Sequence, residues 1–187
     1  MSTDVAPDFV EIPLPKAVQA SAKGGRIAVK GSKGSLERPF PSEVIELTSA
    51  DGRAKLRLKI PPNRKKAKAL LNAWESHVRN LAVGVTAGFE AKMKVVAAHF
   101  PMKVSVKDGR LVIDNFLGEK FPRSAPLCDG VEAKVEGEFV ILTGADIERV
   151  GQSCANIERA THIRDYDPRV FQDGIYIVER AHPRSAN

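Results

Sequence analysis

The side chains in this sequence that are best suited to a chemical task are cations at regular spacing. Between Arg53 and Ile60 charged and apolar residues alternate, which would place Lys55, Arg57 and Lys59 about 7 Å apart in a row along one strand face. Such a row could bind successive phosphate groups of a polyanion. It is more commonly the solvated face of a sheet, and the residues alone leave both interpretations open.

A second group of cations lies where a helix is expected to begin. Arg64, Lys65, Lys66 and Lys68 would occupy its first turns, where the helix dipole disfavours each positive charge by about 0.3 to 1 kcal/mol. Because this unfavourable position is used four times, we expect the side chains to face an anion such as RNA phosphate. The alternative is a helix end that is merely soluble.

The segment from Val29 to Gly34 has the composition of a phosphate-binding loop, since its glycines let backbone amides approach an anion. It lacks the Gly-x-x-x-x-Gly-Lys-Ser/Thr pattern of nucleotide hydrolases, so nucleotide hydrolysis is not expected. Lys30 and Lys33 in this segment are candidates for binding RNA.

A polar stripe is predicted on a helix in the second half of the chain. Gln152, Asn156 and Arg159 are spaced by four and three residues, so they would share one helix face. Their side chains could donate hydrogen bonds to sugar and phosphate oxygens. Most such stripes face water, and that alternative stays open.

The spacing of the reactive side chains indicates neither catalysis nor metal binding. The four histidines have no metal-ligand spacing, and no serine or cysteine lies in a nucleophile motif. Asp165 and Asp167 are expected to belong to a polar loop ahead of a proline rather than to a cation site. We therefore expect no catalytic residue, no metal and no cofactor.

Composition favours a soluble protein with a polyanionic partner. The 187 residues carry 29 Lys and Arg against 23 Asp and Glu, a net charge of +6. Residues 1–85 hold fifteen basic and eight acidic side chains, and residues 86–187 hold fourteen and fifteen. Only two cysteines are present, which indicates a reducing compartment. Without an apolar stretch of about twenty residues or a signal peptide, we expect a cytoplasmic protein with no membrane segment.

Turn dipeptides predict four β-hairpins and hence a largely antiparallel chain. The hairpins are expected at about 16–30, 44–60, 102–116 and 131–143, around Gly24-Gly25, Asp51-Gly52, Asp108-Gly109 and Glu136-Gly137. Apolar residues at three- and four-residue spacing predict one helix from Asn63 to about Ala82. A second helix is expected to be capped by Asp146 and to end near Thr161.

The order hairpin, hairpin, helix occurs twice. It predicts an α+β protein of two tandem duplicated small domains, each an antiparallel sheet with one packed helix. We place the domains at residues 1–83 and 84–187, with a linker-like segment at residues 84–88. A shift of 113 residues aligns residues 13–31 with residues 126–144 and matches six of nineteen positions, which suggests the register of the duplication.

Several longer motifs are similar to those of a known family. They are Asn80-Leu-Ala-Val-Gly-Val-Thr-Ala-Gly-Phe89, Lys92-Met-Lys94, Ala98-His-Phe-Pro-Met102, Asn115-Phe-Leu-Gly-Glu-Lys120, Val150-Gly-Gln-Ser-Cys-Ala-Asn-Ile157 and Arg169-Val-Phe-Gln-Asp-Gly-Ile-Tyr-Ile-Val178. In this order they resemble the sixth protein of the large ribosomal subunit, in its archaeal and eukaryotic form. The first half is similar more loosely, through Ile12-Pro13 and Val29–Gly34, and the resemblance covers about residues 8–182.

The resemblance implies a duplicated α+β fold and a structural, non-enzymatic role in the large ribosomal subunit. It further implies binding to large-subunit (23S-type) ribosomal RNA near the stalk base, the sarcin-ricin region and the factor-binding centre of the cytoplasmic ribosome. The implied partners are that RNA, neighbouring ribosomal proteins and nearby translational GTPases, with no membrane, no cofactor and no homo-oligomer. Family members contact RNA largely through the second domain, which in this chain is nearly neutral.

The residues that the resemblance assigns to RNA binding lie mostly in the second domain: Lys120, Arg123, Gln152, Asn156, Arg159 and a tail from Arg164 to Arg180. In the tail, the guanidinium groups of Arg164, Arg169 and Arg180 are expected to bind phosphates. Phe171 and Tyr176 could stack on exposed bases or riboses.

The geometry of the tail has two interpretations. Asp173-Gly174 is expected to form a turn that aims the arginines, whereas Ile175–Val178 also has the alternating pattern of a strand.

Two other functions also stay open. One is a free RNA-binding regulator or chaperone that uses the same basic surface outside the ribosome. The other, less favoured, is a small hydrolase, for which no motif assembles a nucleophile, a base and an orienting group.

Overall fold

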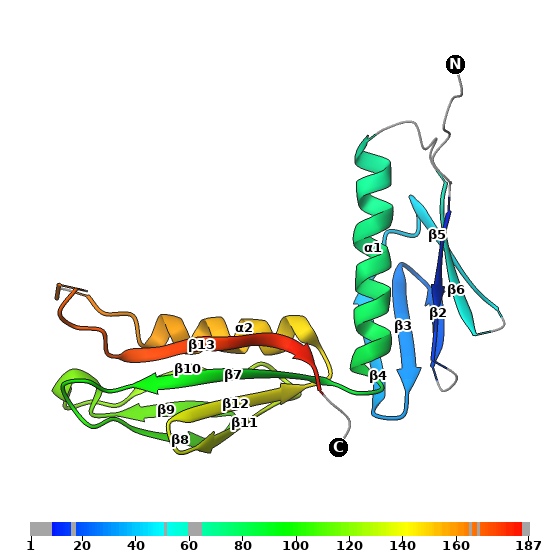
Figure 1. The fold of residues 1–187 in the computed structure, drawn as a ribbon. Coiled ribbons are helices and arrows are strands. Elements are labelled where there is room, and N and C mark those ends of the chain that lie inside the picture. Colours follow the sequence, from blue (N-terminus) through cyan, green and yellow to red (C-terminus); the bar gives the residue numbers. More distant parts are fainter. Residues whose placement is uncertain are drawn as a thin grey trace. The chain divides into compact units, whose positions relative to one another are not determined.

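The computed structural model describes residues 9–15, 18–50, 52–59, 65–164, 166–167 and 169–184. The chain divides into two compact units, Met1–Ala87 (unit 1) and Gly88–Asn187 (unit 2), which Figure 1 shows and which are described separately. The boundary predicted between residues 83 and 84 falls at the end of helix α1 (Lys65–Gly84).

Unit 1 is built from two three-stranded antiparallel sheets and helix α1. One sheet has the strand order β1-β6-β5 and the other the order β2-β3-β4. The strands are β1 (Phe9–Pro13), β2 (Gln19–Lys23), β3 (Arg26–Gly31), β4 (Gly34–Pro39), β5 (Ile45–Ala50) and β6 (Arg53–Leu58). Helix α1 packs against both sheets, and Leu71, Trp74 and Val78 of the helix share one buried core with Ile12 and Leu56.

Unit 2 repeats this plan and adds strand β13 (Gly174–Pro183). Its sheets have the orders β10-β9-β8 and β11-β12-β7-β13. The remaining elements are β7 (Phe89–Val96), β8 (Lys103–Lys107), β9 (Arg110–Asp114), the 3-10 turn η1 (Phe116–Gly118), β10 (Arg123–Pro126), β11 (Val131–Glu136), β12 (Phe139–Gly144) and helix α2 (Ile147–Ala160). As predicted, Asp146 caps α2, because its side chain accepts a hydrogen bond from the Glu148 backbone at 2.9 Å.

The duplication is confirmed, but the predicted register of 113 residues is wrong. The strand order β1-β6-β5 of unit 1 corresponds to β7-β12-β11 of unit 2, and β2-β3-β4 corresponds to β8-β9-β10. Hairpin β2–β3 is therefore equivalent to β8–β9, whereas a shift of 113 aligns it with β11–β12. The misleading matches include Gly24 with Gly137, which arise because each tight turn needs a residue with positive φ.

A shift of 84 residues brings the equivalent hairpins into alignment. Ser21-Ala-Lys-Gly-Gly-Arg26 then lies opposite Ser105-Val-Lys-Asp-Gly-Arg110, with the serine, the lysine, the second turn glycine and the arginine identical. The stretch of identical residues is short, because the rest of each hairpin only has to supply apolar side chains of suitable size to the core of its unit.

The predicted hairpins and helices are confirmed apart from their ends. Each expected hairpin holds an antiparallel strand pair: β2–β3, β5–β6, β8–β9 and β11–β12. The predicted start of α1 at Asn63 lies outside the described residues. The strand interpretation of Ile175–Val178 is confirmed, since these residues belong to β13. Strands β1 and β7 were not predicted, because each pairs with a strand far along the chain and no turn marks it.

Gly31, at the end of β3, is a position where a side chain does not fit. A Cβ atom there would lie 2.5 Å from Val85 Cγ2 and 2.8 Å from Val85 O. We predict that Gly31→Ala lowers the free energy of unfolding of unit 1 by roughly 1–3 kcal/mol, the usual cost of overpacking.

Gly151 in α2 provides the control, because no atom lies within 4 Å of an added Cβ. Gly151→Ala should raise the free energy of unfolding of unit 2 by about 0.5–1 kcal/mol, since alanine loses less backbone entropy in a helix. Denaturant unfolding measures both changes. Effects of the same sign would contradict this account of the two glycines.

Candidate nucleic-acid interface

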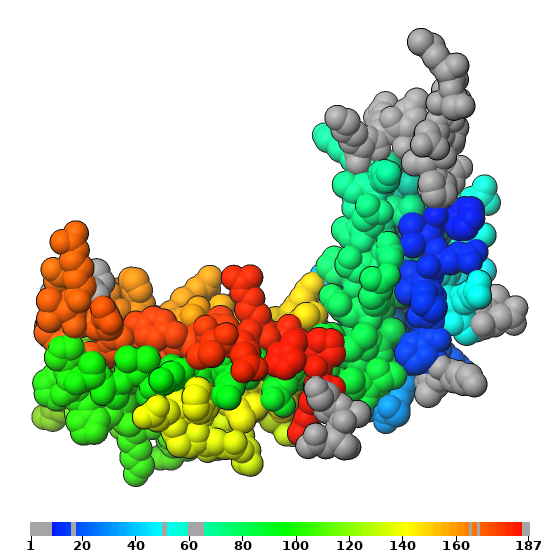
Figure 2. Space-filling model, viewed as in Figure 1, coloured from blue at the N-terminus to red at the C-terminus, as the bar shows by residue number. Residues whose placement is uncertain are grey.

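Three loops lie together at one end of unit 2, and we call this region the loop end. They are the β7–β8 loop (97–102), the β9–β10 loop (115–122) and the α2–β13 loop (161–173). Figure 2 shows the α2–β13 loop, in orange, beside the green surface where β7 ends. The first two loops are joined by Asn115, which donates from Nδ2 to the Pro101 carbonyl at 3.0 Å, and by the Phe100 ring, which packs beside Gly118.

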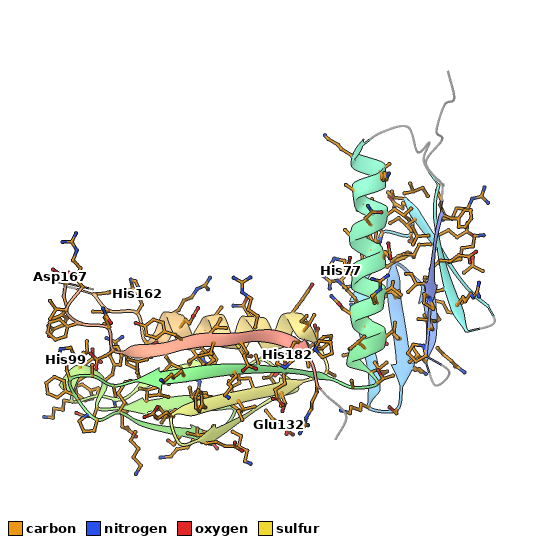
Figure 3. All side chains as sticks on the ribbon, in the orientation of Figure 1. His77, His99, Glu132, His162, Asp167 and His182 are labelled. Atoms are coloured by element: carbon orange, nitrogen blue, oxygen red, sulfur yellow. The ribbon has the colours of Figure 1, made fainter. Side chains whose placement is uncertain are left out.

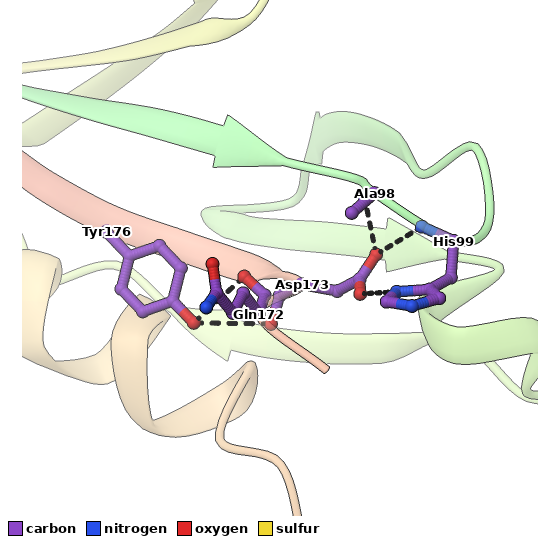
Figure 4. A network of polar contacts seen from close by, with 5 residues as sticks. All are labelled: Ala98, His99, Gln172, Asp173 and Tyr176. Carbon is purple, nitrogen blue, oxygen red and sulfur yellow. Dashed lines mark hydrogen bonds and ion pairs between the residues drawn. The ribbon is translucent and has the colours of Figure 1, made fainter. Parts of the chain in front are cut away.

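The carboxylate of Asp173 ties the α2–β13 loop to the β7–β8 loop (Figure 4). Asp173 is buried, with 1% exposure. Its Oδ1 accepts hydrogen bonds from the backbone N–H groups of Ala98 at 2.7 Å and His99 at 3.0 Å, and Oδ2 lies 2.6 Å from His99 Nδ1. Burial raises the pKa of Asp173, but the hydrogen bonds from His99 and Ala98 outweigh it, and the pKa ends below its ordinary value. Asp173 therefore orders the loops, but the turn predicted at Asp173-Gly174 is wrong, because Gly174 is already the first residue of β13 and the turn lies at Arg169-Val170.

An aromatic stack reinforces the same junction. The Phe171 ring lies 4.6 Å from the His99 ring and 4.7 Å from the Tyr166 ring, measured between centroids. Phe171 is half-buried and makes intramolecular contacts, whereas Tyr166 is 52% exposed. Of the two, Tyr166 has more surface free for stacking on a base.

Arg123 joins the β9–β10 segment to the end of α2. Its Nη1 donates to the carbonyls of Ala160 at 2.9 Å and His162 at 3.0 Å, and its Nε donates to Glu119 at 2.8 Å. The hydrogen bond from Arg123 holds the pKa of Glu119 below its ordinary value. A cation is favourable at this position, since the helix dipole is negative there. Arg123, predicted to bind RNA, thus has a structural role within the protein, and its RNA contact stays a prediction.

Other predicted residues at the loop end are free to meet a partner. Lys120, Arg164 and Arg169 are exposed, and within the described part of the chain their side chains make no ion pair. Phe121, next to Lys120, is 77% exposed, and Val170, next to Arg169, is 60% exposed. The loop end thus combines cations with exposed apolar and aromatic side chains.

The polar stripe on α2 is partly used inside the protein. Gln152 donates to Asn156 Oδ1 at 2.9 Å, and Asn156 donates to the Pro126 carbonyl at 3.0 Å, which ties the helix to the end of β10. Arg159 is exposed and, among the described residues, without an ion-pair partner. Arg159, near the end of α2, is therefore the stripe residue best placed to act with the loop end.

Strand β13 carries Arg180 away from the loop end, whereas the Tyr176 side chain turns back toward it. The Tyr176 hydroxyl donates to the Gln172 carbonyl at 3.2 Å (Figure 4). Its ring lies over Gly174, where an added Cβ would come within 2.9 Å of the ring, so a side chain at this position would push the ring aside. Arg180 follows the register shift after Ile177 and is exposed. The structure thus does not bring Arg180 together with Arg164 and Arg169.

In unit 1, Lys30 is exposed on β3, whereas Lys33 makes internal contacts. The Lys33 ammonium group donates to the Ala87 carbonyl, and its backbone N–H donates to the Val85 carbonyl at 2.8 Å. Lys33 therefore places a positive charge after the C-terminal end of α1, as Arg123 does for α2.

The cation row on β6 has the predicted alternation, because Ala54, Leu56 and Leu58 are buried between its charged residues. Glu11 on β1 lies 3.5 Å from both Arg53 and Lys55. The row is thus partly neutralised by its own sheet, which favours the solvated-face interpretation. Of the helix-start cations, Lys66 and Lys68 are exposed, and the side chains of Arg64 and Lys65 lie outside the described part.

Metal-ligating side chains do not gather in the described part of the chain, where no group of three or more His, Cys, Asp or Glu could hold an ion. Figure 3 shows His99, His162 and Asp167 at the loop end, and His182 at the other end of unit 2. Asp165 lies outside the described residues. Burial raises the pKa of the Cys154 thiol to about 11, so it is a poor nucleophile.

Among the described residues, no helix is long and apolar enough to cross a membrane.

Sequence reasoning missed several residues of the loop end. Tyr166 and Phe121 each lie within two residues of a predicted cation, and this aromatic-beside-cation pattern was a usable signal. Asp173 was expected only to form a turn, and His99 had no assigned role. Their contact joins residues 74 positions apart, which local spacing does not indicate.

The fold and the loop end define a class of protein: a duplicated α+β scaffold that presents cations and aromatic side chains on loops fixed by internal contacts. The family described as "Ribosomal protein L6" matches residues 14–88 and 100–174. The matched segments begin 86 residues apart, close to the 84-residue repeat of the hairpins and far from the predicted shift of 113.

Individual relatives agree with this match over nearly their whole length. The large ribosomal subunit protein uL6 of Methanosarcina mazei is 44% identical over 170 residues, covering 91% of this chain and 96% of the relative. That of Methanobrevibacter smithii is 42% identical over 170 residues (91% and 94%), and that of Ignicoccus hospitalis 42% over 172 residues (90% and 92%). The chain belongs to the ribosomal protein L6 family.

We predict that Asp173→Asn lowers the free energy of unfolding of unit 2 at pH 7 by about 2 kcal/mol, because charge-assisted hydrogen bonds are lost. The folded-state pKa of Asp173 is lowered, so its contribution is complete above the unfolded-state value near 3.8 and is lost as the pH falls through the folded value. The difference between wild type and variant should therefore shrink as the pH falls below about 4.

Glu132→Gln is the control for this titration, since Glu132 is exposed on β11 at a distance from the loop end (Figure 3). It should change the free energy of unfolding by less than about 0.5 kcal/mol. Urea unfolding at a series of pH values checks both variants. An Asp173→Asn effect as large at pH 3 as at pH 7 would show that the carboxylate charge does not hold the loops.

Proposed function

We propose that the chain is a structural component of the large subunit of the cytoplasmic ribosome, and that the loop end of unit 2 binds large-subunit ribosomal RNA. Family membership and the names of the relatives support the first part. The second part is supported by the arrangement of the loop end. The proposal assigns the chain no catalytic residue and no cofactor, and treats it as a single copy rather than a homo-oligomer.

The observation that carries the RNA-binding proposal is the fixed frame of three loops with exposed cations on it. Lys120, Arg164 and Arg169 extend from loops that Asp173 and Arg123 tie together. One guanidinium group can donate hydrogen bonds to two oxygens of the same phosphate group. Exposed rings such as those of Tyr166 and Phe121 can stack on unstacked bases. Because the contacts of Asp173 and Arg123 hold these loops within the protein, binding would cost little conformational entropy.

The nearly neutral charge of unit 2 is compatible with this role. Two carboxylates of the loop end are already bound by the protein, Asp173 by Ala98 and His99, and Glu119 by Arg123. These carboxylates are therefore poorly placed to repel phosphate. Many of the other acids of the unit lie on its strands and on α2, away from the loops.

The resemblance of the motifs also supports a location for the RNA-binding site. The binding site would be ribosomal RNA near the stalk base, the sarcin-ricin region and the factor-binding centre. Neighbouring ribosomal proteins and translational GTPases would then lie close by. Recognition would depend on phosphates, riboses and RNA shape more than on base sequence.

The test replaces three loop-end cations in one variant, Lys120→Gln, Arg164→Gln and Arg169→Gln. Binding of the full chain to large-subunit ribosomal RNA is measured over a range of salt concentrations. We predict weaker binding and a salt slope smaller by about 3, roughly one for each lost phosphate contact.

The matched control removes three cations that are paired with carboxylates elsewhere in unit 2. Lys94, Lys134 and Arg149 lie 3.9, 2.6 and 3.7 Å from Glu138, Glu136 and Asp146. Their replacement by glutamine should leave the salt slope nearly unchanged. Equal losses in the two triple variants would mean that overall charge, and not the loop end, determines binding.

A further inference from the structure

Each unit carries a hairpin tip on which two cations lie side by side. On β2–β3, Lys23 and Arg26 are direct cross-strand partners, and on β8–β9 the same holds for Lys107 and Arg110. All four side chains are exposed. The turns between them have φ values from 47° to 72°, as a two-residue type I′ turn requires.

The surroundings of the two tips are also repeated. The third strand of each sheet ends in a proline that pairs with the arginine of the tip, Pro39 with Arg26 and Pro126 with Arg110. The residue after each proline donates its backbone N–H to the turn glycine carbonyl, at 2.8 Å from Phe40 to Gly25 and 3.0 Å from Leu127 to Gly109. Each tip is therefore held in a defined position on its unit.

This arrangement is unfavourable in the free protein. Side chains directly opposite each other have Cβ atoms only about 4.5–5.5 Å apart, and like charges there destabilise a hairpin. Arg26 has Glu37 at 3.7 Å, but both side chains are more than half exposed, so this pair contributes little. Lys23, Lys107 and Arg110 have no ion pair within the described residues, although Asp108 places one carboxylate in the second turn.

We infer that each hairpin tip binds a phosphate group of the ribosomal RNA backbone, so that both units contact RNA at sites distinct from the loop end. A phosphate between the two cations would remove their repulsion, with the arginine donating two hydrogen bonds and the lysine acting as a point charge. The tip of unit 2 is separate from the loop end. Strand β8 begins beside the β7–β8 loop at Lys103, and the tip lies at the opposite end of this strand, at the turn that starts with Asp108. The inference rests on the proposed function.

The test uses two double variants of the full chain, Lys23→Gln with Arg26→Gln, and Lys107→Gln with Arg110→Gln, and a quadruple variant that combines them. Binding to large-subunit ribosomal RNA is measured across salt concentrations, with Lys94→Gln plus Lys134→Gln as the charge-matched control. Because each tip neutralises one phosphate group, we expect each double variant to reduce the salt slope by about 1 and the quadruple variant to reduce it by about 2. The control should leave the slope nearly unchanged.

Thermal unfolding of the same variants provides an independent readout. Because each double variant removes a like-charge pair, its melting temperature should stay the same or rise, while RNA binding weakens. A reduced slope together with a lower melting temperature would indicate that the pairs stabilise the fold, and would overturn the inference.

The binding data also separate this inference from the proposed function. If the hairpin variants bind like wild type while the loop-end triple variant binds weakly, the hairpin sites are refuted and the loop-end site stands. If wild-type protein itself fails to bind large-subunit RNA, both proposals fail.

Discussion

Each unit depends on one helix that packs across two small sheets. A small sheet must bury its apolar face against another element to be stable, and α1 and α2 each supply that second layer for both sheets of their unit. This arrangement brings the C-terminal end of each helix beside a connecting segment of the second sheet. In both units a cation at the start of the third strand of that sheet, Lys33 just before β4 or Arg123 at the beginning of β10, donates to carbonyl groups at or just beyond the helix end. The arrangement recurs because the C-terminal end of each helix carries the partial negative charge of the helix dipole, which a nearby cation stabilises.

The difference between the units explains where the candidate interface lies. After α1 the chain leads directly into β7, whereas after α2 it must return to pair β13 with β7. That return forms the α2–β13 loop, and the hydrogen bonds of Asp173 fix the loop against the start of the β7–β8 connection. The loop end is therefore a consequence of the added strand, which accounts for a candidate site in the less basic half of the chain.

The parts of the fold that local sequence determines were predictable. Turn glycines marked the hairpins, and three- and four-residue spacing marked both helices. The pairing of β1 with β6 and of β7 with β12 depends on contacts far apart in sequence, so no local signal revealed it. The register of the duplication was wrong for a related reason, because turn glycines recur in every hairpin and do not distinguish one from another.

The candidate site was predictable in its residue types more than in its geometry. Lys120, Arg164 and Arg169 are exposed, as an RNA contact requires. Spacing could not show that Arg123 and Asn156 donate to backbone carbonyls, since those acceptors belong to distant segments. Whether any of these side chains touches RNA stays a prediction.

The most direct test of the account is sedimentation of native extract through a sucrose gradient, before and after a high-salt wash, with detection of this chain. The chain should comigrate with large ribosomal subunits and stay with them after the wash. Detection only in low-mass fractions would contradict a structural role in the subunit and would favour a free RNA-binding regulator.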